Sequence, residues 1–257
     1  MSILGRRLPE LLADALAPNM CLLCGQHCPG PLALCQGCDS DLPHLTSGCR
    51  RCALPMPGTT TGECGDCLRA PPPFKRCIAA CNFDYPVDSL IRDFKHRRKQ
   101  AVGAVLAGLL VRKLPGAYAD DEWPDVITAV PLHWRRLLQR GFNQAALLAG
   151  QVGRPLQLPV ANLCRRPHYT PPQQRAGRTE RRKNLRDAFR ITGCVRGKHI
   201  AIVDDVVTTG NTVSELARAF KNAGARRVDV WAIARTPRAR RMLTLARQLR
   251  ATAAQGL

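Results

Sequence analysis

The sequence predicts an α/β fold, a parallel sheet with flanking helices, preceded by a small cysteine-rich zinc domain. Two observations carry this prediction. Short apolar runs alternate with segments of helical periodicity over residues 78–234, which is typical of a parallel sheet. Residues 21–67 instead hold four C-x-x-C knuckles and few large apolar side chains, too few for a core without metal. The proline run 71–73 lies between these regions, so we expect domains over residues 1–75 and 76–257.

The knuckles of the first domain predict two structural zinc sites, because each knuckle presents two thiolates to one tetrahedral metal ion. Pairing in sequence order is expected, although the spacing leaves a crossed pairing open. An iron–sulfur cluster suits short paired knuckles less well. The expected ligands are Cys21, Cys24, Cys35, Cys38, Cys49, Cys52, Cys64 and Cys67.

Disulfides are the alternative use of these cysteines, and they require an oxidising compartment. Glu10 and Asp14 interrupt any apolar stretch that could act as an export signal, so we expect a cytoplasmic protein with reduced thiols. No run approaches 18 apolar residues, and no transmembrane helix is expected. Cysteines outside the knuckle grid are expected to be spare (Cys28) or to pack as small buried groups (Cys77, Cys81, Cys164 and Cys194).

The second domain is expected to alternate strands and helices. The first part of this domain is expected to form a strand over 78–83, a long helix over 87–114, a strand over 125–130 and a basic loop over 135–144. A helix from the N-cap Asn143 to about 150 follows, then a weak strand over 155–163, a polar arm over 165–187 and a short strand over 188–191. The last part is expected to form a buried strand that begins near 200, a helix that ends before Gly224, a strand over 226–234 and a helical tail.

The strand that begins near residue 200 ends in the adjacent acids Asp204 and Asp205, at the edge where open α/β sheets bind ligands. A hydroxyl-rich loop follows, in which Gly210 allows close backbone approach, and Thr212 with Glu215 predicts a capping box for the next helix. A helix start is an anion site. Carboxylates beside it suit a phosphorylated sugar with vicinal hydroxyls. A Walker-B acid is excluded, because the chain has no G-x-x-x-x-G-K-[ST] motif.

This stretch resembles the signature of type I phosphoribosyltransferases. The resemblance implies that Asp204 and Asp205 hold the ribose hydroxyls of phosphoribosyl pyrophosphate (PRPP), which binds with Mg²⁺. It also implies that the following loop surrounds the 5′-phosphate. The residues of that loop are Thr208, Thr209, Gly210, Asn211 and Thr212.

The whole chain is similar to the ComF family, whose members have a type I phosphoribosyltransferase-like fold with an N-terminal double zinc ribbon and are associated with DNA uptake in naturally competent bacteria. The motifs that carry this likeness are the paired knuckles, FDYPVDSLIRDFKH, VPLHWRRLLQRGFNQ, TPPQQ, RTERRKNLRDAF and IVDDVVTTGNT. The resemblance implies a pyrophosphate-facing loop at Pro131, Leu132 and His133, a hood segment at Phe94 and Lys95, and a mobile arm that includes Gln173, Gln174, Arg178, Arg181, Arg182 and Asn184. It assigns no catalytic residue and identifies no acceptor.

The positive charge of the chain favours nucleic acid as a binding partner. The formal net charge is +20 and the isoelectric point is about 10.2. Residues 1–75 balance to zero, and residues 165–198 hold eleven Lys or Arg against two acids. Aromatic residues make up only 5%, which is few for stacking on a single strand; Trp134, Phe142 and Tyr169 lie near basic loops.

We therefore expect a PRPP-binding protein of DNA uptake (natural transformation) that engages single-stranded DNA, with other DNA-uptake proteins as possible partners. The alternative is a true Mg²⁺-dependent phosphoribosyltransferase that acts on an unidentified small-molecule acceptor.

Overall fold

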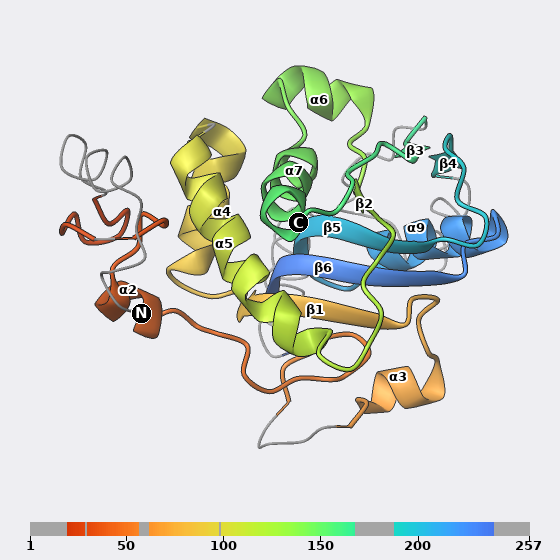
Figure 1. Cartoon of the computed structure of the whole chain (residues 1–257), viewed down its shortest axis with the longest axis horizontal. Helices are drawn as coiled ribbons and strands as arrows, with labels where there is room; N and C mark the ends of the chain where they lie inside the picture. Colours follow the sequence, from red (N-terminus) through yellow and green to blue (C-terminus); the bar gives the residue numbers. More distant parts are fainter. Residues whose placement is uncertain (1–19, 29, 57–61, 98, 168–187, 239–257) are drawn as a thin grey trace, which may run out of the picture.

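A four-stranded parallel sheet forms the centre of the molecule (Figure 1). The structure is a computed structural model that describes residues 20–28, 30–56, 62–97, 99–167 and 188–238. The strand order is β1 (Arg76–Asn82), β6 (Arg227–Arg235), β5 (His199–Val207) and β2 (Val126–Ala129). Most residues of the strands are apolar and buried, because helices cover both faces of the sheet.

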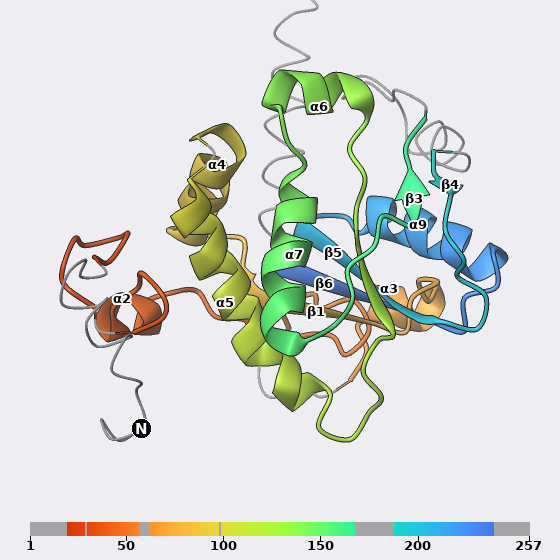
Figure 2. The same ribbon diagram turned by 45° about the horizontal axis from the view of Figure 1, so that its top comes forward.

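The helices lie on opposite faces of the sheet (Figures 1 and 2). On one face α5 (Gln100–Ala117) packs on β1 and β6, and α7 (Gln144–Leu156) packs on β5 and β2; α9 (Asn211–Asn222) packs on the other face. The chain therefore leaves β2 toward one face and β5 toward the other. The carboxyl ends of these neighbouring strands form a topological switch point, where ligands of open α/β sheets bind.

Smaller elements surround this edge. Helix α4 (Val87–Arg97) precedes α5, and α6 (Trp134–Arg140) follows β2. The two-residue strands β3 (Cys164–Arg165) and β4 (Arg190–Ile191) pair in an antiparallel ladder.

The cysteine-rich segment lies against the β1 side of the sheet. It contains two short helices, α2 (Gln36–Ser40) and α3 (Gly65–Arg69), each of which starts within a knuckle. Leu42 and Leu45 belong to the same hydrophobic cluster as the sheet, and the Leu45 N–H donates to Ala80 O of β1 at 3.0 Å. Because β1 begins at Arg76, the predicted division after residue 75 falls at the start of this strand, but the division itself stays a prediction.

Several predicted element boundaries were wrong. The long helix over 87–114 is two helices, since α4 ends at Arg97 and α5 begins at Gln100. The basic loop over 135–144 contains α6. Residues 155–163 do not form a strand: α7 continues to Leu156, and Val160 makes only an isolated parallel bridge with Ile127 of β2. The expected helical tail lies outside the described residues.

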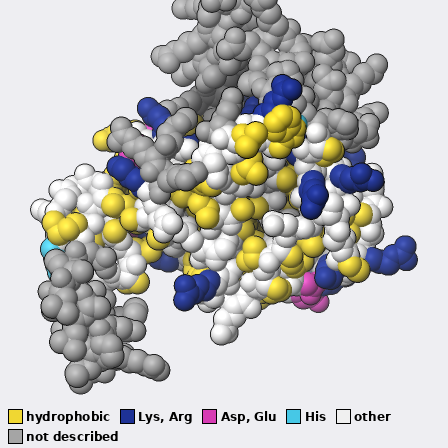
Figure 3. Space-filling view, turned by 90° about the horizontal axis from the view of Figure 1, so that it is seen from above, with side chains coloured by type: hydrophobic (Ala, Val, Ile, Leu, Met, Phe, Trp, Pro, Cys, Tyr) yellow, Lys and Arg dark blue, Asp and Glu magenta, His cyan; other side chains and the backbone are white. Residues whose placement is uncertain are grey.

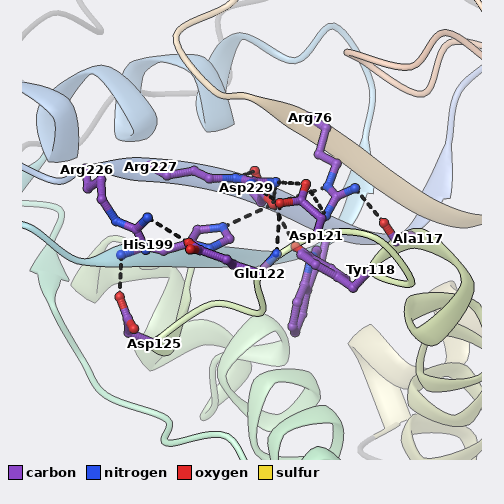
Figure 4. Close-up of polar contacts among 11 residues, drawn as sticks. Arg76, Ala117, Tyr118, Asp121, Glu122, Asp125, His199, Arg226, Arg227 and Asp229 are labelled. Carbon is purple, nitrogen blue, oxygen red and sulfur yellow. Dashed lines mark hydrogen bonds and ion pairs between the residues drawn. The ribbon is translucent and has the colours of Figure 1, made fainter.

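The amino ends of the strands hold a buried polar network (Figure 4). Asp229 is fully buried and accepts hydrogen bonds from the Tyr118 hydroxyl at 2.7 Å and from Arg227 Nη2 at 2.9 Å. Arg76 Nε lies 3.3 Å and His199 Nε2 3.1 Å from the same carboxylate. Two cations and a hydroxyl thus compensate the buried charge, and they join β1, β5 and β6 at the edge opposite the switch point.

The helices within the described ranges include none that is both long and apolar enough to cross a membrane.

Candidate functional site

The acid pair lies at the switch point, close to the carboxyl end of β5. Asp204 and Asp205 are half-buried, and the strand continues past them to Val207. The Asp205 N–H donates to Asp204 Oδ1 at 2.9 Å, and Lys95 Nζ of α4 lies 2.8 Å from Asp205 Oδ2. A cation from the predicted hood segment therefore already contacts one carboxylate of the pair.

Asp204 has an unfavourable position for a carboxylate. Burial raises its pKa to about 8, with a further contribution from the negative charge of Asp205, while the Asp205 N–H and Lys95 act in the opposite direction. Two adjacent acids with one nearby cation hold a proton more readily than isolated carboxylates do. The pair therefore offers both hydrogen-bond acceptors and a proton that can be released.

The loop after β5 has the conformation of an anion-binding turn. Gly210 is the N-cap of α9 and has a φ of 81°, which glycine adopts without strain. Thr208, Thr209 and Asn211 are exposed, and the Asn211 N–H donates to Thr209 Oγ1 at 3.3 Å. The unpaired N–H groups of a helix's first turn concentrate partial positive charge at this end of α9.

The predicted capping box at Thr212 was wrong. The helix begins one residue earlier, at Asn211, behind the Gly210 cap, and no side chain makes the cap hydrogen bond. Glu215 instead pairs with Arg218, one turn further along α9. The first turn is consequently left without a carboxylate of its own, which favours an external anion.

The second predicted loop, Pro131-Leu132-His133, connects β2 to α6. The Val130 N–H donates to Val203 O at 3.0 Å, which places the start of this loop beside the acid-bearing strand. His133 is buried and caps α6, with Nδ1 accepting from the Arg135 N–H at 3.2 Å. Burial, together with nearby arginine cations, lowers the pKa of His133, which favours the neutral form of its ring.

The start of α7 and the end of α4 meet at the same edge. Asn143 is the N-cap of α7, as predicted: its Oδ1 accepts from the Ala145 N–H at 3.1 Å, while its Nδ2 donates to Val130 O at 3.0 Å. Phe94 packs edge-on against Phe142, and Gln144 Nε2 donates to Lys95 O at 3.4 Å. These contacts fix the α4 segment that places Lys95 on Asp205.

Other predicted residues lie outside the described part of the chain. These are the arm residues Gln173, Gln174, Arg178, Arg181, Arg182 and Asn184.

Sequence reasoning missed Arg235, the last residue of β6. Its side chain is buried, with Nε donating to Cys52 O at 2.8 Å and Nη1 donating to Val207 O at 2.8 Å and to Thr208 O. No local motif surrounds it, and Cys52 is 183 residues away in the sequence, so no periodicity or spacing could have identified this role.

The eight knuckle cysteines form two clusters in sequence order, as expected. In each, all four Sγ atoms lie within 4.8 Å of one another: Cys21, Cys24, Cys35 and Cys38 in the first tetrad, and Cys49, Cys52, Cys64 and Cys67 in the second. One sulfur pair in each tetrad is 3.7 Å apart, close to the ~3.8 Å edge of a tetrahedron with Zn–S bonds of about 2.3 Å.

Backbone N–H groups prepare these thiols for a metal. The Cys64 N–H donates to Cys49 Sγ at 3.1 Å, and although burial opposes ionisation of Cys49, such hydrogen bonds lower its pKa to about 7. Four thiolates saturate a tetrahedral Zn²⁺ and leave no open position, so the donor sets fit two structural zinc ions. Cys28 lies outside both tetrads; Cys77, Cys81 and Cys164 are buried as predicted, whereas Cys194 is exposed and that prediction was wrong.

Family models match both parts of the chain. The model described as a double zinc ribbon domain matches residues 12–68, and the one described as a phosphoribosyl transferase domain matches residues 139–245. The second match includes the acid pair and the loop after it.

Curated relatives match over most of the chain. It is 36% identical over 227 residues to DNA utilization protein YhgH of Salmonella typhi, covering 85% of this chain and 98% of the relative. It is 30% identical over 220 residues to Competence protein F of Haemophilus influenzae, covering 81% and 95%. Among solved structures, glutamine PRPP amidotransferase from B. subtilis is 21% identical, with a TM-score of 0.36 and coverage of 51% of this chain and 26% of that chain. A double zinc ribbon, a phosphoribosyltransferase-type domain and relatives matched nearly end to end occur together here, and the chain belongs to the ComF family of competence and DNA utilization proteins.

Proposed function

We propose that this protein binds PRPP with Mg²⁺ at the switch point and acts on single-stranded DNA in the cytoplasm during DNA uptake. The observation that carries the PRPP part is the position of Asp204 and Asp205 beside the Gly210 turn at the start of α9. Carboxylates are good acceptors for ribose hydroxyls, and a helix start binds a phosphate. In this arrangement loop 208–212 would bind the 5′-phosphate, and the loop Pro131-Leu132-His133 would face the pyrophosphate.

Lys95 adds a specific expectation for this site. Its ammonium contacts Asp205, and a ribose hydroxyl that donates to Asp205 competes for the same oxygen. On ligand binding we expect Lys95 to move toward the phosphates, where an ammonium is a common partner. Arg178 and Arg182, in the arm, are proposed to approach the pyrophosphate as the resemblance implies.

A second surface supports the DNA part of the proposal. A cleft of about 550 Å³ lies between α6 and the β3–β4 pair, beside the Pro131 loop, and is lined by Trp134, Arg165, Arg166 and Arg190 among others. Arg165 and Arg190 are exposed and directly opposite in the β3–β4 ladder, where like charges repel. No described carboxylate pairs with either of them. A polyanion in the cleft would relieve this repulsion.

One aromatic side chain, Trp134, also lines the cleft. Trp134 is 55% exposed, and Lys and Arg side chains outnumber acidic ones on the face of the molecule seen from the α6 side (Figure 3). An exposed indole beside guanidinium groups suits a stacked base and its phosphates. The relatives named DNA utilization protein and Competence protein F favour DNA as the polymer.

The PRPP part is tested by isothermal titration of the full-length protein with PRPP, with and without Mg²⁺, and separately with ribose 5-phosphate and pyrophosphate. We expect Mg²⁺-dependent binding of PRPP that is tighter than binding of either fragment, because each fragment fills only part of the site. Equal affinity for PRPP and pyrophosphate would mean that the acid pair contributes nothing.

The DNA part is tested by the salt dependence of single-strand binding. The Arg165→Ala/Arg190→Ala variant should reduce the slope of log affinity against log salt by roughly 0.7 for each DNA phosphate that the protein no longer neutralises. Trp134→Ala should weaken binding with little change in slope, because stacking is not ionic. A matched control is Arg226→Ala, whose exposed side chain pairs with Glu122 at the opposite edge of the sheet. Slopes that are equal in all variants would remove the cleft from the proposal.

A true phosphoribosyltransferase is the second candidate, because the same site would bind PRPP for transfer to an acceptor. Two results together would favour this enzyme: release of pyrophosphate in the presence of an acceptor, and no DNA binding even at low salt.

A further inference from the structure

Arg235 connects two parts of the molecule that are far apart in the sequence. Its guanidinium lies between the second tetrad and the loop after β5, and its Nε and Nη1 donate to backbone carbonyls. Nε donates to Cys52 O at 2.8 Å, whereas Nη1 donates to Val207 O at 2.8 Å and to Thr208 O. The Thr236 N–H also donates to Val207 O, at 3.1 Å, so these three hydrogen bonds join the end of β6 to Val207 and Thr208.

Arg235 is 2% exposed and forms no ion pair with a described carboxylate. Burying a full positive charge against neutral carbonyls alone is costly. Four thiolates exceed the charge of one Zn²⁺, so a zinc centre in the second tetrad is anionic and stabilises a neighbouring cation. The first tetrad differs within the described residues: Arg112, which reaches its helix α2, pairs with the carboxylate of Asp39 at 2.7 Å and is about half exposed.

A cavity of about 280 Å³ shows how closely the second tetrad approaches the loop. Its lining includes Cys52, Cys64 and Cys67 on one side and Thr209, Gly210 and Asn211 on the other. The metal ligands and the proposed phosphate loop therefore face the same space, with Arg235 at its boundary.

We propose that Arg235 is a positioning residue that couples the second cysteine tetrad to loop 208–212, so that metal in this tetrad, and not in the first, sets the conformation of the phosphate loop. The proposal rests on the proposed PRPP site for its ligand readout. The knuckle fixes the position of Cys52 O, and this carbonyl orients the Arg235 guanidinium. The guanidinium in turn fixes the positions of Val207 O and Thr208 O.

The matched test variants are Cys38→Ser and Cys67→Ser, which remove the last cysteine of the first and second tetrads respectively. Each should lower the zinc content by about one ion per chain. Only Cys67→Ser should weaken PRPP binding, by a factor in the roughly 5- to 150-fold range of typical couplings between sites. Only Cys67→Ser should also speed amide hydrogen exchange in residues 208–212. Equal effects of the two variants on both readouts would overturn the proposal.

Arg235→Lys tests the coupling residue itself, because it keeps the charge but loses the planar fork that reaches both sides. It should retain two zinc ions and still show faster exchange in residues 208–212 and weaker PRPP binding. Arg76→Lys is the control: it removes a half-buried guanidinium beside Asp229, at the opposite edge of the sheet, and should leave the loop unchanged. Normal exchange in Arg235→Lys would contradict the proposal.

The two hypotheses fail separately. If the wild-type protein does not bind PRPP, the proposed function is wrong, and the exchange comparison between Cys38→Ser and Cys67→Ser still decides whether the tetrad controls the loop.

Discussion

At the scale of single residues, Asp204 shows that the candidate site reduces stability. Its carboxylate is half-buried next to a second acid, and burial raises its pKa to about 8. An unfolded aspartate has a pKa of about 3.9, so the folded state binds the proton more strongly. The contribution of this group to stability is therefore greatest at low pH and falls as the pH rises from about 4 toward 8.

Asp204→Asn should remove this dependence. Relative to the wild type, we expect the variant to gain roughly 1–3 kcal/mol in free energy of unfolding between pH 6 and pH 8, after allowance for the partial exposure of the group. Urea denaturation at the two pH values measures the gain. Asp205→Asn is the comparison variant: it relieves the repulsion on Asp204 but loses the ion pair with Lys95, so its gain in stability should be smaller. Parallel pH profiles for wild type and Asp204→Asn would contradict this explanation.

The acid pair was predictable because Asp204 and Asp205 are adjacent and follow an apolar run. The contact between Lys95 and Asp205 was not, since the two residues are distant along the chain and meet only when α4 packs near the end of β5. Residue pairs of this kind depend on the packing of elements, which a pattern in a single segment does not encode.

At the scale of elements, the unit β5–loop–α9 combines a buried strand with a helix start that depends on Gly210. The strand and the loop were predictable because their signals are contiguous. Helix ends were less predictable: α7 runs past its predicted end at Gly150 to Leu156, because Val152 and Gly153 of its last turns are buried. A Cβ at Gly153 would lie 2.5 Å from Val160 Cγ2, so glycine there serves close packing and does not mark a stop.

Gly210→Ala tests the turn. The added Cβ would have its nearest contact at 3.9 Å, so the expected cost comes from the positive φ and amounts to roughly 1–2 kcal/mol of stability. PRPP affinity should fall as the first turn of α9 shifts. Gly150→Ala is the control, because a Cβ there meets nothing within 4 Å inside a helix, and it should stabilise by about 0.5–1 kcal/mol. Thermal unfolding of both variants measures these changes in stability. A Gly210→Ala variant as stable as the wild type would show that the loop tolerates another conformation.

At the scale of the whole molecule, the sheet separates two polar ends. The amino ends hold the Asp229 network, which compensates its charge internally, and the carboxyl ends hold acids and cations that are only partly compensated. The cysteine-rich segment contacts β1 and reaches the second end through Arg235. The sequence predicted the cysteine-rich segment and the acid-bearing strand, but neither their contact nor the Asp229 network: Cys52 and Arg235 are 183 residues apart, and Tyr118 and Asp229 are 111 apart.

Metal content tests the architecture of the cysteine-rich segment. Elemental analysis should give about two zinc ions per chain, because four thiolates saturate each tetrahedral site. Strong chelation should lower the melting temperature, since a segment with so small a core depends on its metal. One zinc per chain, or iron in its place, would be inconsistent with two structural zinc sites.

The central claim is that the carboxyl end of β5 binds PRPP, and the most direct measurement is isothermal titration of Mg²⁺–PRPP into the Asp204→Asn/Asp205→Asn variant beside the wild type. We predict that the wild type binds and that the variant, folded and with unchanged zinc content, does not, because the ribose hydroxyls lose their charged acceptors. Wild-type affinity in the folded double variant would contradict the account.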